Sequence, residues 1–309
     1  MPHGPETLAH AVDRTAPMHP ADVDGDDLAL LDGFVTMALQ AGAAILEIYN
    51  GEAVASLVKR DGSPVTAADR VGEAIILAAL DRLAPGLPVV AEEAVAAGTV
   101  PLTSGDFILV DALDGTREFV ARREDFTVNI ALVRDRCPVL GVVFAPALGA
   151  LYAGLPGGGA WRGDIVNGAA AAWMPISAAR REGGAAAGLR VVASRSHMSD
   201  ATRDYIRRFD VAGLVSAGSS LKFCRVATGE ADLYPRLGRT MEWDTAAGDA
   251  VLRAAGGTVV TLGGLPLTYG KRRQPDDADF ANPWFVAHGA FDLAACRVDR
   301  ATAASERVS

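Results

Sequence analysis

The chain has 309 residues, half of them hydrophobic and 22% charged, so it can bury one large core or two medium ones. Its formal net charge of −9 argues against the broad basic surface that attracts nucleic acid polymers, so an anionic ligand needs locally gathered cations. Its three cysteines are far apart and form no C-x-x-C pair, which argues against a disulfide framework or a zinc knuckle and favours a reducing cytoplasm.

The N-terminal region combines an extension with a long helix. Residues 1–26 contain neither a basic n-region nor an apolar h-region, so we expect a disordered extension rather than a signal peptide. Apolar residues then recur at helical spacing as far as Tyr49, which predicts an amphipathic helix with Asp26 or Asp27 as its N-cap. Polar residues interrupt this stretch too often for a membrane span of about 20 apolar residues, so no integral membrane segment is predicted.

A second helix and a series of strands follow. The helix is predicted from Thr66 to Leu83, because Thr66 and Asp69 have the form of a capping box and Pro85-Gly86 ends the element. Short apolar runs then predict strands, and three glycines after the last of them mark a turn. These strands are expected at Pro88–Ala91, Phe107–Val110, Thr127–Val133, Val139–Ala145 and Leu151–Leu155.

The composition changes to Ala, Gly and Arg without periodicity over residues 174–188, which predicts a variable loop between two lobes. The first is an α+β metal-binding lobe at 27–173 and the second an α/β lobe at 189–298, followed by a tail at 299–309. Strands interleaved with helices predict a layered arrangement in the second lobe. Its elements are expected at Leu189–Ala193, Ser199–Phe209, Ser220–Thr228, Ala231–Tyr234, Asp244–Ala255 and Thr258–Leu262.

The most specific pattern is a hydrophobic strand, Phe107–Val110, followed by Asp111-Ala-Leu-Asp114-Gly115-Thr116. It places two carboxylates at a strand end, where they can share hard cations such as Mg2+, which takes oxygen ligands at about 2.0–2.1 Å. The amides after Gly115 open a helix, and a helix N-terminus favours a phosphate group. An Asp-Gly turn with a capping threonine would have the same sequence, so the hexapeptide alone leaves both interpretations open.

Further acidic residues stand where other predicted elements begin or end. Glu92 and Glu93 follow the strand that ends at Ala91, and Asp244 opens a predicted helix. Each acid has an ordinary structural explanation: Glu93 as a solvated neighbour, Asp244 as an N-cap and Asp69 as the acid of a capping box. Four or five acids that converge without cations would repel one another, so bound divalent ions are the natural way to keep such a cluster ionised.

In their order along the chain, these segments resemble the inositol monophosphatase superfamily. The resemblance covers roughly residues 31–269 and includes Thr66-Ala-Ala-Asp69, Glu92-Glu93, Asp111 to Thr116 and Trp243-Asp-Thr-Ala-Ala-Gly248. Longer matches resemble the bacterial 3'(2'),5'-bisphosphate nucleotidases, at 59–69, 126–131, 218–224 and 243–248. The resemblance implies an α+β fold, a layered αβαβα sandwich of the inositol monophosphatase and fructose-1,6-bisphosphatase type.

The resemblance also implies a site with two Mg2+ ions and a third that is held weakly. Glu92 and Asp111 would bind the first ion together with the carbonyl oxygen of Leu113. Asp111, Asp114 and Asp244 would bind the second ion, so that Asp111 bridges the two. In such a site one ion lowers the pKa of the attacking water and the other stabilises the leaving alkoxide. Li+ is expected to inhibit, as the resemblance implies.

The catalytic residues implied in the same way are Asp69, Thr116 and Glu92. Thr116 and Asp69 would orient and deprotonate the attacking water, and Glu92 would also reach the third ion. Two residues depart from the pattern of the family: Ala112 stands where Pro is usual, and Arg117 stands where Lys is common. Neither changes a ligand, but the loss of Pro loosens the metal loop and therefore affects metal affinity.

A bisphosphate carries a second phosphate that the metals do not neutralise, so cations and hydroxyls of the second lobe must bind it. Ser219, Lys222 and Arg236 lie in segments that resemble the binding face for this phosphate and the ribose, and His197 resembles a base-side contact. Lys222 and Arg236 equally fit ordinary surface charges. The full set of implied substrate-binding residues is Gly115, Thr116, His197, Ser219, Lys222, Arg236 and Asp244.

The resemblance implies a Mg2+-dependent phosphatase that converts 3'-phosphoadenosine 5'-phosphate to AMP and phosphate in sulfur assimilation. One alternative is an inositol or sugar monophosphatase on the same fold. Another is a non-catalytic metal-binding regulatory protein, which the intact set of Asp69, Glu92 and Thr116 disfavours because a binder needs no water-activating pair. The expected location is the cytoplasm. The resemblance also leaves open a peripheral association with the inner face of the cell membrane. No feature of the sequence specifies an oligomeric state.

Overall fold

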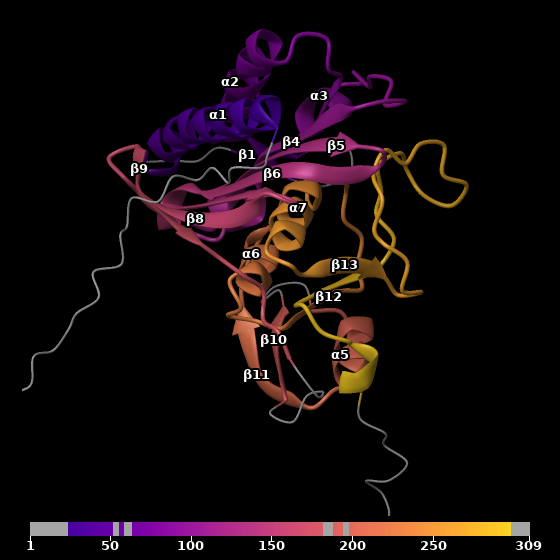
Figure 1. The fold of residues 1–309 in the computed structure, drawn as a ribbon. Helices are drawn as coiled ribbons and strands as arrows, with labels where there is room; N and C mark the ends of the chain where they lie inside the picture. Colours follow the sequence, from indigo (N-terminus) through magenta and orange to yellow (C-terminus); the bar gives the residue numbers. More distant parts are fainter. Residues whose placement is uncertain (1–23, 52–55, 59–63, 182–187, 194–197, 298–309) are drawn as a thin grey trace, which may run out of the picture.

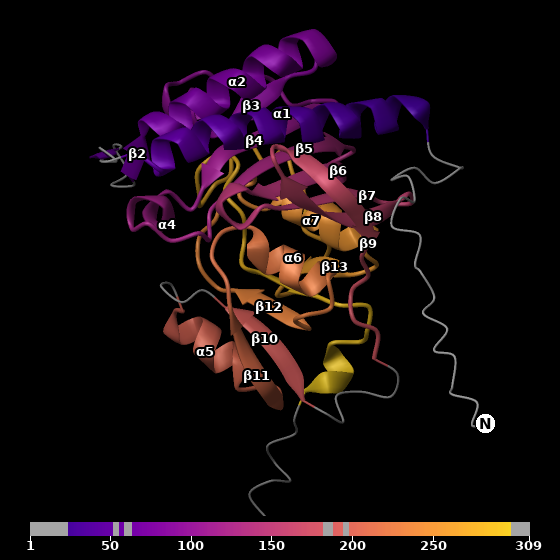
Figure 2. The same cartoon turned by 90° about the vertical axis from the view of Figure 1, so that its left-hand side faces the viewer.

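The computed structural model describes residues 24–51, 56–58, 64–181, 188–193 and 198–297. These residues form five layers in the order α-β-α-β-α (Figures 1 and 2). The first layer consists of α1 (Gly25–Tyr49) and α2 (Ala67–Leu83), which cover one face of a seven-stranded sheet. Between this sheet and a five-stranded sheet lie α6 (Leu221–Ala227) and α7 (Ala246–Ala254). The fifth layer contains α5 (Asp200–Ile206), so the predicted layered α+β sandwich is confirmed.

The seven-stranded sheet has the strand order β3-β4-β5-β6-β7-β8-β9, with β3 and β4 parallel and all other neighbours antiparallel. The five strands predicted from the sequence are all present. Strands β8 and β9 were not predicted, because they are rich in Ala and Gly, which have weak strand preferences. The bounds are β3 (Val89–Ala91), β4 (Phe107–Asp114), β5 (Thr127–Arg134), β6 (Cys137–Ala145), β7 (Ala150–Leu155), β8 (Gly159–Val166) and β9 (Ala169–Pro175).

The five-stranded sheet has the order β11-β10-β12-β14-β13, in which β10 is parallel to both of its neighbours and β14 is antiparallel to both of its own. The sequence did not predict β11 or β14. The bounds are β10 (Leu189–Ala193), β11 (Val211–Ser216), β12 (Leu233–Arg236), β13 (Thr258–Thr261) and β14 (Phe285–His288). Along the chain, the strands of the first sheet end at Pro175 and those of the second sheet begin at Leu189, so residues 174 and 175 of the expected variable loop belong to β9.

The remaining described elements are short. β1 and β2 form a separate antiparallel pair, and two single-turn 3-10 helices, η1 and η2, complete the set. Their bounds are β1 (Ser56–Val58), β2 (Pro64–Thr66), η1 (Pro146–Leu148) and η2 (Ala294–Cys296). The C-terminal tail, most of the expected N-terminal extension and part of the expected variable loop lie outside the described residues.

Helix α1 begins two or three residues earlier than the sequence suggested. Its N-cap is Asp24, whose carboxylate accepts a hydrogen bond from the amide of Asp26 at 3.1 Å. Within the described part of the chain, α1 is the one helix that is long and apolar enough to cross a membrane by length and composition. In the fold its apolar face packs on α2 and on the first sheet, which explains that composition. The buried residues are Leu31, Phe34, Val35, Met37, Ala38, Ala41, Gly42 and Ile45.

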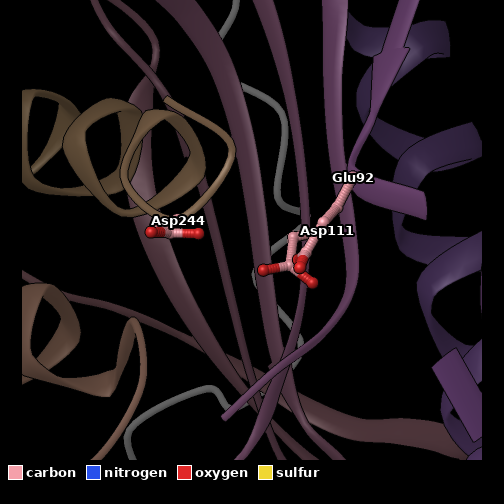
Figure 3. A group of neighbouring side chains, drawn as sticks. All are labelled: Glu92, Asp111 and Asp244. Atoms are coloured by element: carbon pink, nitrogen blue, oxygen red, sulfur yellow. The ribbon is translucent and has the colours of Figure 1, made fainter. Parts of the chain in front are cut away.

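Helix α7 lies very close to the opposite face of the same sheet. A Cβ atom added to Gly154 on β7 would stand 2.5 Å from the Cα atom of Val251, so only glycine permits this approach. The helix starts at Ala246 with Thr245 as its N-cap, two residues later than predicted, and Asp244 therefore lies in the turn before it. Asp244 in this turn lies opposite Glu92 and Asp111 (Figure 3).

Candidate metal centre and active site

Three carboxylates converge where the pairing of β3 with β4 ends. The two strands are parallel and pair Ala91 with Val110, so Glu92, directly after β3, and Asp111, which the sequence placed after the strand but which lies within β4, are side by side. Asp244 faces them from the turn before α7 (Figure 3). One carboxylate oxygen from each of the three residues lies within 4.8 Å of the other two, an arrangement that suits a bound metal ion.

A β-bulge brings the second aspartate of the motif to the same face. Residues three apart on a regular strand point to opposite faces, but the pairing with β5 shifts between Asp111 and Asp114. Asp111 is opposite Asn129 and Asp114 is opposite Thr127, and these partners are two residues apart on β5. Both aspartates therefore face the layer of α6 and α7, which is where Asp244 lies.

Asp111 is the most strongly constrained of the acids. It is 2% exposed, its Oδ1 atom accepts a hydrogen bond from the amide of Leu113 at 3.0 Å, and no donor among the described residues reaches Oδ2. Burial and the charges of Glu92, Asp114 and Asp244 raise the pKa of Asp111 well above its usual value.

The same physical causes act on Asp244, whose pKa burial and the neighbouring charges of Asp114 and Glu92 raise strongly. A buried, unpartnered oxygen among like charges is costly without a cation. The oxygen-only donor set is the one that Mg2+ prefers, so the residues present fit a divalent metal site.

Asp114 lies in the first lobe and is hydrogen-bonded to the second. Its Oδ2 atom accepts from the hydroxyl of Ser219 at 2.6 Å, and Ser219 Oγ lies 2.5 Å from Thr127 Oγ1. Ser219 has a φ of 51°, in the left-handed region that L-residues other than Gly, Asn and Asp seldom adopt, so its position depends on these contacts. The carboxylate of Asp114 thus links the strand end to the segment before α6.

Asp69 and Thr116 come together although they are 47 residues apart. The Oγ1 atom of Thr116 donates to Asp69 Oδ1 at 3.0 Å and also lies 3.3 Å from the carbonyl oxygen of Leu113. The other carboxylate oxygen of Asp69 accepts from the amide and the hydroxyl of Thr66, both at 2.7 Å, which completes the predicted capping box of α2. Asp69 therefore caps α2, as the sequence predicted, and also accepts a hydrogen bond from the hydroxyl of Thr116.

Thr116 opens the short helix α4 (Thr116–Val120), as the sequence predicted, and Gly115 is its N-cap. Gly115 has a φ of 93°, and an added Cβ atom would stand 3.1 Å from the carbonyl oxygen of Asp125. Both the conformation and the space therefore favour glycine at this position. Gly115 and Thr116 line a pocket that also contains Glu92 and Asp244.

This pocket has a volume of about 420 Å³, which is in the range of small-molecule sites. Eight predicted site residues line it: Glu92, Asp114, Gly115, Thr116, Ser219, Lys222, Arg236 and Asp244. His197 lies outside the described residues. Sequence reasoning missed Tyr234 as a wall of the pocket and Arg239 as a third second-lobe cation, although Arg239 follows Arg236 by only three residues.

Lys222 is not the surface charge that an isolated lysine would suggest. Its side chain is buried, its Nζ atom donates to the carbonyl oxygen of Ser219 at 2.5 Å, and it lies 5.5 Å from the centre of the Tyr234 ring. Burial lowers the pKa of Lys222 to about 8; the nearby charge of Asp114 raises it and that of Arg236 lowers it. Arg236 is half-buried, and its Nε atom has no acceptor among the described residues.

The chain belongs to the inositol monophosphatase family, because the sequence profile of that family matches residues 28–281. A relative from Shigella flexneri, named 3'(2'),5'-bisphosphate nucleotidase CysQ, is 41% identical over 257 residues, which cover 83% of this chain and 98% of the relative. The family predicted from the sequence motifs is therefore confirmed.

Two solved structures have the same fold. The crystal structure of CysQ from Bacteroides thetaiotaomicron, a bacterial member of the inositol monophosphatase family, is 36% identical with a TM-score of 0.68 and covers 85% of this chain and 98% of that one. An inositol monophosphatase from Anabaena (Nostoc) sp. PCC 7120 is 25% identical with a TM-score of 0.65, over 85% of this chain and 92% of that one. The CysQ structure is thus the more similar of these two.

Proposed function

We propose that this protein is a Mg2+-dependent 3'(2'),5'-bisphosphate nucleotidase that converts 3'-phosphoadenosine 5'-phosphate to AMP and phosphate. The observation that carries the proposal is a carboxylate cluster with an unpartnered oxygen on Asp111, which opens into a pocket that also contains the buried cation of Lys222. The similarity to relatives named as bisphosphate nucleotidases supports the choice of substrate.

Glu92, Asp111, Asp114, Asp244 and the carbonyl oxygen of Leu113 would hold two divalent ions, and Glu92 would also reach a third. Ions bound there would lower the pKa of water and stabilise the leaving oxygen of the ester. The donor set is entirely oxygen, which favours Mg2+ over softer metals.

The residues of the chain would position and deprotonate the attacking water. The hydroxyl of Thr116 donates to Asp69, so its lone pairs remain available to accept a hydrogen bond from a water in the pocket. A proton taken from that water by Thr116 can pass to Asp69, because their oxygen atoms are 3.0 Å apart. Amides at Gly115 and Thr116 would hold the reacting phosphate at the start of α4.

The second lobe would bind the phosphate that does not react. Lys222 and Arg236 both line the pocket, and the charge of Arg236 lowers the pKa of Lys222. Ser219 would add a hydroxyl contact, and the base would lie toward His197. These are contacts that a bisphosphate can make and a monophosphate cannot, so we propose that they select the substrate.

The proposed activity is tested by following phosphate release from 3'-phosphoadenosine 5'-phosphate with and without Mg2+. We expect release that requires the metal, with 5'-AMP as the product. Release of the 5'-phosphate, or a rate unchanged by chelation of divalent ions, would contradict the proposal. We propose that this reaction clears the by-product of sulfate activation in sulfur assimilation. We also propose a cytoplasmic location, in agreement with the three free cysteines.

The pH dependence of substrate choice should report the charge on Lys222. Because the pKa of Lys222 is about 8, its ammonium is present at pH 7 and mostly lost at pH 9. A phosphate monoester is fully ionised above pH 7, since its second pKa is about 6. We therefore expect the ratio of kcat/KM for the bisphosphate to kcat/KM for inositol 1-phosphate to fall as pH rises from 7 to 9.

Taking this ratio removes pH effects on the metal centre, which both substrates share. In Lys222→Met the ratio should be lower and independent of pH. A wild-type ratio that stays constant across this range would show that Lys222 does not contact the second phosphate.

A further inference from the structure

A buried glutamate that the proposed chemistry does not use caps the helix that begins with Glu92. Helix α3 (Glu92–Ala96) has Ala91 at its N-cap position, and alanine offers no side-chain acceptor for the first amides of the helix. Glu73 supplies the acceptors from α2. Its Oε2 atom accepts from the amide of Glu93 at 2.8 Å, and its Oε1 atom accepts from the amide of Ala94 at 2.9 Å.

These two amides are the second and third of α3, the ones that a local N-cap side chain would normally satisfy. Glu73 is 6% exposed and is 20 residues away from Glu93 along the chain, so this cap is a tertiary contact and not a local one. The contact fixes the first turn of α3 and with it the backbone of Glu92, which lies between β3 and the two bonded amides.

One face of α2 contacts both Thr116 and the helix that begins with Glu92. Asp69 and Glu73 are four residues apart and so lie on the same side of the helix. Asp69 holds Thr116, whereas Glu73 holds α3. Between them, Gly72 packs closely on β4, because an added Cβ atom would stand 3.2 Å from the Cβ atom of Ala112. Helix α2 therefore touches the water-activating pair, the metal loop and the helix of Glu92.

We infer that Glu73 is a positioning residue that holds Glu92 in the geometry needed for metal binding. The inference rests on the proposed function only in taking Glu92 as a metal ligand. Without the two hydrogen bonds, the first turn of α3 loses its cap and Glu92 samples other positions. Partners that orient a metal ligand commonly change metal affinity by about 10–100-fold when they are removed.

The experiment uses the full chain and two variants, Glu73→Gln and Glu73→Ala. In the metal-free protein, hydrogen exchange followed by mass spectrometry should show faster exchange in a peptide that spans Val89 to Thr99. Titration calorimetry with Mg2+ alone should show a dissociation constant raised by about tenfold or more in Glu73→Ala. Glu73→Gln should fall between this variant and the wild type, because its amide oxygen can still accept one of the two bonds.

A matched control separates positioning from general stability. Asp232 is fully buried and bonds Arg181 and Arg190 in the second lobe, so Asp232→Asn should lower the melting temperature without changing exchange at residues 89–99 or Mg2+ affinity. Glu73 variants that bind Mg2+ like the wild type, or an Asp232 variant with the same loss of affinity, would overturn the inference. A wild type that binds Mg2+ but releases no phosphate from the bisphosphate would contradict the proposed function alone.

Discussion

Asp111→Asn is expected to abolish most of the phosphatase activity and, at the same time, to raise the melting temperature of the metal-free protein. The activity falls because the variant loses a charge shared by both proposed ions, and preorganised electrostatic groups are commonly worth about a hundredfold or more in rate. The stability rises because Asp111 is buried among Glu92, Asp114 and Asp244 with one oxygen unpartnered. An asparagine removes the repulsion, and its amide can donate to these carboxylates.

The response to Mg2+ gives a second measurement on the same variant. An ion that binds the folded state raises the melting temperature as its concentration increases. We expect this rise in the wild type and little of it in Asp111→Asn. Thermal unfolding with and without Mg2+, together with a phosphate-release assay, provides all the values needed.

Asp232→Asn is the control, because it makes the same chemical change at another buried acid. Asp232 bonds Arg181 at 2.7 Å and Arg190 at 2.8 Å, so its loss leaves two guanidinium groups without their partner and should destabilise the protein. Its Mg2+ response and activity should stay near those of the wild type. An Asp111→Asn variant that keeps its activity at saturating Mg2+, or that melts at a lower temperature than the wild type, would refute the metal assignment.

The second large effect concerns substrate choice. Lys222→Met keeps most of the side-chain volume beside Tyr234 but removes the ammonium group. Charge-assisted hydrogen bonds contribute roughly 1.5–3 kcal/mol, so kcat/KM for the bisphosphate should fall by about tenfold to more than a hundredfold. Hydrolysis of inositol 1-phosphate should barely change, because its single phosphate rests on the metals and on the amides at Gly115 and Thr116. Both substrates are compared at one salt concentration, since exposed charges are screened.

Lys271 offers a second, partly buried lysine as the control. Its Nζ atom pairs with Glu242 at 2.7 Å, and the carboxylate of Glu242 also accepts from the amides of Gly270 and Lys271. Glu242 precedes Asp244 by two residues, so Lys271→Met should disturb the metal centre and lower kcat/KM for both substrates alike. If Lys222→Met shows this same parallel loss, its role is structural and Lys222 does not select the substrate.

Motifs with a local physical cause could be predicted well from the sequence. The capping box at Thr66 and Asp69 fixed the start of α2, and the glycine of the Asp-Gly-Thr motif fixed the start of α4. Strands β4 and β5 were also predicted, because a continuous apolar run indicates a buried strand. The resemblance to a family supplied the grouping of acids that lie far apart in the sequence.

Features that depend on tertiary contacts could not be predicted in this way. The bulge after Asp111 depends on pairing with β5, and the cap that Glu73 gives to α3 joins residues on different elements. The burial of Lys222 follows from packing between the two sheets, which no local pattern encodes. A glutamate one turn after Asp69 was the available signal for Glu73, since residues four apart share a helix face.

The most direct test of the central claim is kcat/KM of the wild type for 3'-phosphoadenosine 5'-phosphate and for inositol 1-phosphate, measured side by side with Mg2+. A pocket that combines the metal centre with the buried Lys222 and Arg236 should favour the bisphosphate. We expect a preference of at least about tenfold, the value of one charge-assisted contact. Equal values, or a preference for inositol 1-phosphate, would contradict the account and indicate a monophosphatase on the same fold.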